Sequence, residues 1–315
     1  MNSAIDVTPE RGRTITGKVS DAIWRNPKMF LFFLLLPPVL WLGIVYVGSL
    51  IALLVQSFFA IDEFTGLVKR EFTFKTYGEL LHPANLDIIV RTITTAIVVT
   101  LSAAIVAFPI AYYAARYARG KWKAIFYLGI MLPLWSSYLV KIYAWKLILA
   151  KEGILNWVFA NLHLSWLLDA ILSIPVIGGN SLSVSYLGTC IVFLYVWLPF
   201  MILPLQASLE RVPSNLLEAS ADLGANPKKT FRHVILPLAL PGLFAGSIFT
   251  FSLTLGDYII PQIIGSSRLF IGQAVYAHQG TAGNIPLAAA FTIVPIVVMG
   301  FYLWMAKRQG AFEAL

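Results

Sequence analysis

Residues 208–237 read SLERVPSNLLEASADLGANPKKTFRHVILP, and this polar stretch separates two long apolar runs. Its centre has the spacing of a short amphipathic helix. The apolar face of that helix comprises Leu216, Leu217, Ser220 and Leu223. Pro213 or Ser214 is suited to begin the helix, and Gly224 is suited to end it, because glycine readily adopts the left-handed conformation. A helix of about two to three turns is marginal alone in water, so we expect its exposed face to dock on a partner.

The composition of the chain indicates a membrane protein. Of the 315 residues, 58% are hydrophobic and only 12% are charged, which is more apolar surface than a soluble fold of this length buries. The net charge of +8 does not come from one basic soluble segment, and this argues against a nucleic-acid partner. Basic residues that flank apolar spans instead set the orientation of a chain in the membrane.

Apolar runs long enough to cross a bilayer occur along most of the chain. A membrane-spanning helix needs about 20 apolar residues, because each residue rises only about 1.5 Å. The six segments that qualify are 29–57, 88–115, 124–149, 184–206, 239–263 and 285–306. Prolines inside them, such as Pro133, predict kinks that membrane helices tolerate. We therefore expect an all-α polytopic membrane protein with six transmembrane helices.

The positions of the basic residues orient these spans. With an inner N-terminus and six spans, most of the 23 Lys and Arg residues fall in inner segments, as the positive-inside rule requires. An apolar stretch at 153–177 would reverse part of this asymmetry if it crossed, so we place it on the outer face as an interfacial or re-entrant segment. The expected domains are a cytoplasmic basic tail (1–28), a transmembrane domain (29–306) containing the loop 208–237, and a cytoplasmic tail (307–315).

Signatures of catalysis are weak in this sequence. The segment 12–18 has the glycine spacing of a phosphate-binding loop, but Val19 stands where Ser or Thr would hold magnesium, and no strand precedes it. No zinc motif or nucleophile with its base is visible, and Cys190, which lies in an apolar run, is expected to serve in packing. We therefore expect no enzyme activity and no cofactor bound by this chain. A carrier driven by an ion gradient is also disfavoured, because no convincing internal repeat is present.

One spacing in the polar loop resembles a known family. Glu218-Ala219-Ser220, then Gly224, then Val234-Ile235-Leu236-Pro237 is similar to the EAA loop of ABC importer permeases, and the span pattern over about 29–308 is similar to that of six-span type I (MetI-like) importers. The resemblance implies that the loop forms a coupling helix that seats in a groove of the ATPase subunit. The expected ATPase-coupling residues are Leu216, Leu217, Glu218, Ala219, Ser220, Leu223 and Gly224. Ser220 stands where the family usually has a second alanine.

The same resemblance implies a permease subunit that works by alternating access in the bacterial inner membrane, with both termini cytoplasmic. The implied partners are a second, different permease chain, two ATP-binding cassette subunits that use ATP and Mg, a soluble substrate-binding protein and membrane lipid. Residues 133–145 (PLWSSYLVKIYAW) and 255–258 (LGDY) resemble the spermidine/putrescine branch of these permeases, which implies polyamine import. The alternative is another small charged solute: a phosphonate, an opine, an amino acid or iron.

Several polar and aromatic residues inside the expected spans are candidates for the translocation path. An ionisable group in an apolar span is costly and usually faces a water-filled path or a partner. The candidate path and gate residues are Asp257, Tyr258, Lys141, Trp135, Tyr138 and Trp145. The aromatic rings would attract an organic cation if they face the path, and otherwise they pack against lipid or neighbouring helices. On the path, Lys141 would repel a polycation and attract a carboxylate or phosphonate. Alternatively, it pairs with Asp257 or with an acid on the partner subunit as a gate or structural lock; the residues leave these alternatives open.

Overall fold

The computed structural model describes residues 27–62 and 64–308. The segment with the phosphate-loop spacing and most of both expected tails lie outside the described residues. The chain divides into two units, Met1–Val55 and Gln56–Leu315. Apart from a small antiparallel pair formed by β1 (Ala60–Ile61) and β2 (Val68–Lys69), every regular element in the described ranges is helical, as the expected all-α class requires.

The described part of the first unit is one apolar helical stretch. It comprises α2 (Pro27–Leu40), a π-helical segment (Trp41–Val47) and α3 (Gly48–Gln56), and none of these residues is buried. A helix that is apolar all round has no stable place in water and is suited to lipid. The first expected span is confirmed as a helix over Pro27–Gln56.

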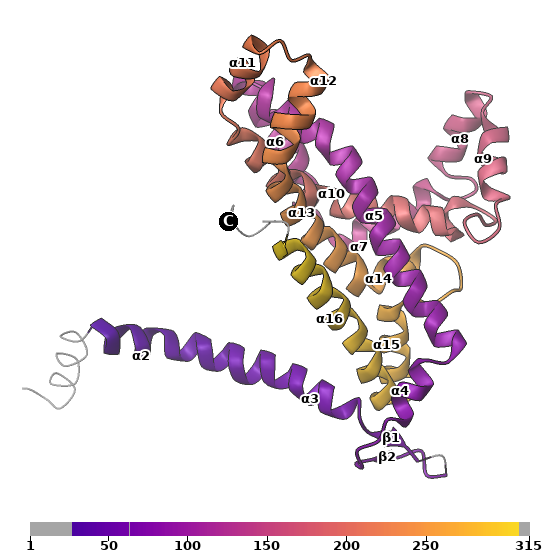
Figure 1. Cartoon of the computed structure of the whole chain (residues 1–315). Helices are drawn as coiled ribbons and strands as arrows, with labels where there is room; N and C mark the ends of the chain where they lie inside the picture. Colours follow the sequence, from indigo (N-terminus) through magenta and orange to yellow (C-terminus); the bar gives the residue numbers. More distant parts are fainter. Residues whose placement is uncertain (1–26, 63, 309–315) are drawn as a thin grey trace, which may run out of the picture. The chain divides into compact units, whose positions relative to one another are not determined.

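The second unit is built around α10, which packs against both α5 and α13 (Figure 1). The long elements of this unit are α5 (Pro83–Arg116), α10 (Tyr186–Glu210), α13 (Leu236–Gly256) and α16 (Ile285–Arg308). Small residues allow the close approach: alanines of α5 are buried at positions 96, 103, 107, 111 and 114. On α13, a Cβ added at Gly246 would lie 2.9 Å from the backbone of Met201 on α10.

Shorter helices fill the connections between these long elements. They are α4 (Lys75–Leu80), α6 (Gly120–Trp135), α7 (Tyr138–Ile148), α8 (Ile154–Asn161), α9 (Ser165–Leu172), η2 (Leu182–Val184), α11 (Ser214–Asp222), α12 (Pro227–Thr230), η3 (Phe231–Ile235), α14 (Ile259–Ile263) and α15 (Ile271–Gly280). The elements α12, η3 and α13 form one continuous helix, Pro227–Gly256. The described chain holds five helices that are long and apolar enough to span a membrane, or six spans when the bent pair α6 and α7 counts as one.

The third expected span, 124–149, is not one kinked helix, and this expectation is corrected. Helix α6 ends at Trp135, α7 begins at Tyr138, and their axes differ by 97°. Ser136 has an extended backbone and Ser137 is not helical, so the carbonyl of Pro133 is released from the helical ladder. It accepts hydrogen bonds from Ser136 Oγ (2.9 Å) and Lys141 Nζ (2.7 Å), which satisfies a group that lipid would leave unpaired.

The fifth expected span, 239–263, also ends early. Helix α13 stops at Gly256, and Asp257 has an extended backbone before α14 begins at Ile259. Asp257 Oδ1 accepts hydrogen bonds from the backbone N–H groups of Ile259 (2.7 Å) and Ile260 (3.1 Å), which is the usual role of aspartate at a helix start. Asp257 therefore lies in a helix break rather than inside a continuous span.

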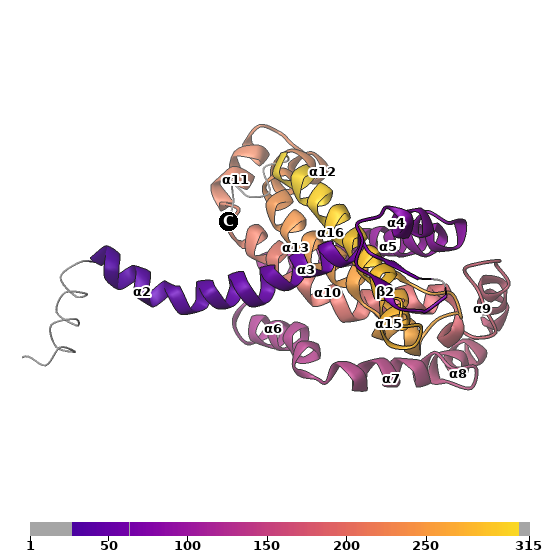
Figure 2. The same cartoon turned by 90° about the horizontal axis from the view of Figure 1, so that it is seen from below.

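The segment 153–177 does not cross the membrane as one helix. It forms α8 and α9, which lie side by side in both views (Figures 1 and 2) and are each too short to span a bilayer. Trp157 and Trp166 are exposed, whereas Leu168 packs in the core with residues of α10. The pattern of exposed Trp suits a bilayer interface, and the interfacial placement remains a prediction.

Candidate coupling helix and translocation pocket

Helix α11 forms where the sequence predicts it. Pro213 is extended and Ser214 is the first helical residue, while Leu223 ends the helix and Gly224 follows with φ +72°. A left-handed residue at this position suits glycine, because other residues are strained there. Asn226 then accepts a hydrogen bond from the backbone N–H of Lys229 (2.9 Å) and begins α12.

The expected apolar face of α11 is divided between two directions. Leu217 packs against the cluster that contains Leu209 and Ile235, and the Ser220 hydroxyl is hydrogen-bonded to that of Thr230 at 2.9 Å. These two residues therefore attach α11 to its own chain. The four residues of the expected apolar face therefore do not all lie on the exposed side of α11, because Leu217 and Ser220 contact the rest of the chain; their role in ATPase coupling stays a prediction.

The outward side of α11 remains uncovered in this chain. Glu218 and Ala219 are exposed, Leu216 is 41% exposed and Leu223 is 87% exposed. Large apolar side chains at the tip of a helical hairpin are typical of an interaction surface. The seven expected coupling residues therefore differ in their surroundings. Gly224 forms the turn, Leu217 and Ser220 attach α11 to its own chain, and the other four are exposed: Leu216, Glu218, Ala219 and Leu223.

A pocket of about 400 Å³ lies beside the helix break at Asp257. It is lined by Tyr138, Trp197, Ser252, Leu253, Gly256, Asp257, Tyr258 and Ile259. The Tyr138 hydroxyl donates a hydrogen bond to the carboxylate of Asp257, and its ring stacks on Trp197 with centroids 5.9 Å apart. The pocket therefore joins one carboxylate to aromatic surfaces from three helical segments. In a membrane protein, irregular backbone is tolerated where it lines a cavity.

Three of the six path candidates line this pocket, and three do not. Asp257, Tyr258 and Tyr138 are part of its wall. Trp135 is 81% exposed at the end of α6, and Trp145 packs on Tyr195 with centroids 5.1 Å apart. The packing alternative therefore holds for Trp145 in this structure.

The hypothesis of an ion pair between Lys141 and Asp257 is wrong in this structure. Lys141 donates to the carbonyl of Pro133, whereas the carboxylate of Asp257 receives Tyr138 and two backbone N–H groups. Both side chains form hydrogen bonds with uncharged groups, so the ammonium group of Lys141 does not pair with the Asp257 carboxylate. Trp197 and Ser252 belong to the pocket but carry no sequence signal, because each is one more residue in an apolar span.

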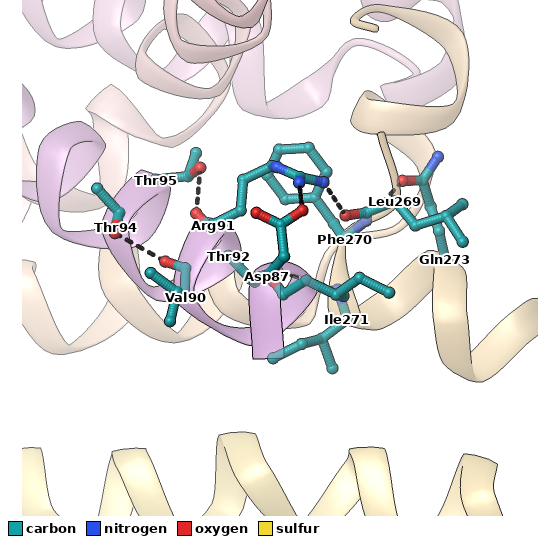
Figure 3. Close-up of polar contacts among 11 residues, drawn as sticks. Asp87, Val90, Arg91, Thr92, Thr94, Thr95, Leu269, Phe270, Ile271 and Gln273 are labelled. Carbon is teal, nitrogen blue, oxygen red and sulfur yellow. Dashed lines mark hydrogen bonds and ion pairs between the residues drawn. The ribbon is translucent and has the colours of Figure 1, made fainter. Parts of the chain in front are cut away.

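The chain that follows α14 is anchored on α5 (Figure 3). Arg91 Nη1 donates to the carbonyl of Leu269 (2.9 Å), and the backbone N–H of Ile271 donates to Thr92 Oγ1 (3.0 Å). Arg91 also pairs with Asp87 one turn earlier on α5. This clamp explains a basic residue inside an apolar span, and it fixes the chain on the far side of the Asp257 break.

Cys190 lies on α10 and is partly buried against the cluster that includes Val192, Phe193 and Ile264. The packing role expected for it is confirmed.

Comparisons with known proteins agree on one class. Residues 107–310 match the family described as binding-protein-dependent transport system inner membrane component. The chain is 57% identical over 312 residues, covering 99% of itself and 100% of the relative, to the inner membrane ABC transporter permease protein YdcU of Escherichia coli K12. It is 30% identical over 256 residues, covering 80% of itself and 88% of the relative, to the spermidine/putrescine transport system permease protein PotB of the same strain.

The solved structures agree in fold. A chain of the bacterial alginate ABC transporter in complex with alginate pentasaccharide-bound periplasmic protein aligns with TM-score 0.68 at 16% identity, covering 92% of this chain and 96% of that one. A chain of the MetNI methionine ABC transporter aligns with TM-score 0.53 at 17% identity, covering 73% and 96%.

The spans, the broken helices and these matches together define a multi-pass inner-membrane permease subunit of an ABC importer. The chain belongs to the family of binding-protein-dependent transport system inner membrane components, since the family match covers more than half of its length.

Proposed function

We propose that this chain lines a pathway that imports polyamines such as putrescine and spermidine. The names of the PotB relatives support this cargo, while the name of the YdcU relative states no cargo. Transport follows alternating access, and the energy comes from ATP and Mg used by separate subunits rather than by a cofactor on this chain.

The observation that carries the proposal is the chemistry of the Asp257 pocket. A carboxylate attracts an alkylammonium group, and the faces of Tyr138, Trp197 and Tyr258 add cation–π attraction. The lysine that would repel a polycation, Lys141, is turned to a backbone carbonyl. The apolar part of the wall suits the methylene chain between the amines of a polyamine.

The outward side of α11 supports docking on an ATPase. Leu216, Glu218, Ala219 and Leu223 form a surface that this chain leaves uncovered. The assembly then comprises this chain, a second permease, two ATPase subunits and a soluble binding protein, in contact with lipid. Both termini are cytoplasmic in this arrangement, and Lys307 and Arg308 at the end of α16 suit the inner interface.

The test is a transport measurement on the assembled complex. The transporter is purified through a tag on this chain, reconstituted in proteoliposomes with its binding protein, and supplied with labelled putrescine, spermidine or a phosphonate. ATP-dependent uptake of the polyamines and not of the phosphonate is the expected result. Uptake of the phosphonate, or of an amino acid or iron in the same assay, would replace polyamines by that solute class.

A further inference from the structure

A polar cluster joins α6 to the inner end of α10, one short loop before α11. Glu210 Oε1 lies 2.9 Å from Lys123 Nζ of α6 and accepts hydrogen bonds from Tyr127 (3.0 Å) and Gln206 (3.3 Å). The side chains of Lys123 and Glu210 are 40% and 31% exposed, so the pair is partly shielded from water. Charged hydrogen bonds that converge on one oxygen are stronger than a simple surface ion pair.

The loop between α10 and α11 is held in the same region. Arg116, the last residue of α5, donates to the carbonyl of Val212 (2.7 Å), and Val212 is 4% exposed. Leu217 of α11 packs on the core that includes Ile130 of α6 and Leu209 of α10. Helix α11, the end of α10 and the inner half of α6 are therefore one packed body, and close-packed bodies move as units.

Two helical arms lead from this body to the Asp257 pocket. The first is the continuous helix Pro227–Gly256, which follows α11 and ends directly before Asp257. The second is α6, whose end is braced on α7 by the contact from Lys141 to Pro133, and α7 begins with Tyr138. The two arms meet in the hydrogen bond between Tyr138 and Asp257.

We propose that the Glu210 cluster is the joint that makes the two arms move together, so that displacement of α11 reaches the Tyr138 side of the pocket through α6 and α7. Lys123 and Glu210 are positioning residues in this scheme, and they do not contact the cargo. Without the joint, the first arm still moves with α11, but α6 and α7 lag behind. The proposal rests on the docking of α11 proposed above and adds the route by which the motion spreads.

The test follows motion at the break between α6 and α7 and needs no cargo. Cys190 is the only cysteine of the chain, so Cys190→Ala gives a cysteine-free parent, and Ser137→Cys places one exposed thiol at the break. The maleimide labelling rate of this thiol is measured in the assembled transporter with and without ATP and vanadate. In the parent we expect nucleotide trapping to change this rate by roughly fivefold or more, the lower range of coupling between distant sites.

Lys123→Met and Glu210→Gln are each expected to abolish most of this change, while the ATPase remains bound and ATP hydrolysis continues. The exchanged pair, Lys123→Glu with Glu210→Lys, is expected to restore it, which a purely structural defect would not show. Tyr127→Phe removes one hydrogen bond and leaves the ion pair, so it should give an intermediate change even if a stronger variant fails to assemble. Lys69→Met breaks an exposed ion pair with Glu71 and serves as the unaffected control.

A nucleotide-dependent change that persists in Lys123→Met and Glu210→Gln would overturn the proposal. The proposal would also be overturned if both single variants lost the nucleotide-dependent change in labelling rate and the exchanged pair did not restore it. A labelling rate in the parent that does not respond to nucleotide would overturn it as well. If the ATPase does not copurify with the parent at all, the docking of α11 fails instead, and the two failures are thus distinguished.

Discussion

At the scale of single residues, Asp257 combines two roles that a substitution can separate. Its Oδ1 begins α14 by accepting two backbone N–H groups, and its charge faces the aromatic pocket. Asparagine is an equally good residue at a helix start, so Asp257→Asn keeps the turn and removes only the charge. A hydrogen bond to a charged group contributes about 1.5–3 kcal/mol. We expect polyamine uptake to fall roughly tenfold while assembly with the ATPase is unchanged.

The absence of an ion pair between Lys141 and Asp257 leads to a second prediction at this scale. If the two charges locked each other, removing both would be less harmful than removing one. Because each has a different partner, we expect Lys141→Met combined with Asp257→Asn to lose uptake by about the product of the two single losses. Better transport by the double variant than by Asp257→Asn alone would show that the lock forms in another state of the cycle.

Gly246 has no side chain and therefore allows α13 to pack closely against α10. A methyl group there would lie 2.9 Å from Met201 of α10, so Gly246→Val forces α13 and α10 apart. Overpacking of this kind costs about 1–3 kcal/mol, and we expect a lower midpoint of thermal unfolding in detergent. Gly300→Val on α16, where nothing lies within 4 Å, is the matched control and should unfold close to the wild-type midpoint.

At the scale of elements, the inward residues of α11 pack against the rest of the chain, and its outward residues are exposed and form the proposed docking surface. Leu223 is 87% exposed, so Leu223→Ser should leave the permease folded but weaken copurification of the ATPase by roughly tenfold, as loss of a buried leucine at an interface does. Leu67→Ser, on a 70% exposed residue near β2, should leave copurification intact. Equal loss in both variants would mean that general surface polarity, and not docking, is responsible.

At the scale of the whole molecule, the predicted topology places α11 and the β1–β2 hairpin on opposite sides of the membrane. In the cysteine-free background of Cys190→Ala, Glu218→Cys should react with an impermeant thiol reagent only after the membrane is opened. Phe64→Cys, which replaces a 98% exposed residue in the hairpin, should react in intact spheroplasts. The reverse pattern would invert the orientation and remove α11 from any cytoplasmic ATPase.

The sequence alone determined the class, the approximate positions of the apolar spans and the position of α11, because these depend on local information. Apolar length identifies a span, and a glycine after a helical period marks the end of a helix wherever the chain goes. The start of α11 at Ser214 and the turn at Gly224 are therefore found as predicted.

The tertiary structure decided which residues meet. The break after Trp135 and the one at Asp257 depend on partners for freed backbone groups, which come from Lys141 in the next helix and from the carboxylate of Asp257 itself. Trp197 joins Tyr138 and Asp257 only because three separate helical segments converge on one pocket. Periodicity and composition indicate whether a segment is suited to lipid or to water. They do not indicate which other segments it contacts, because those contacts depend on tertiary packing.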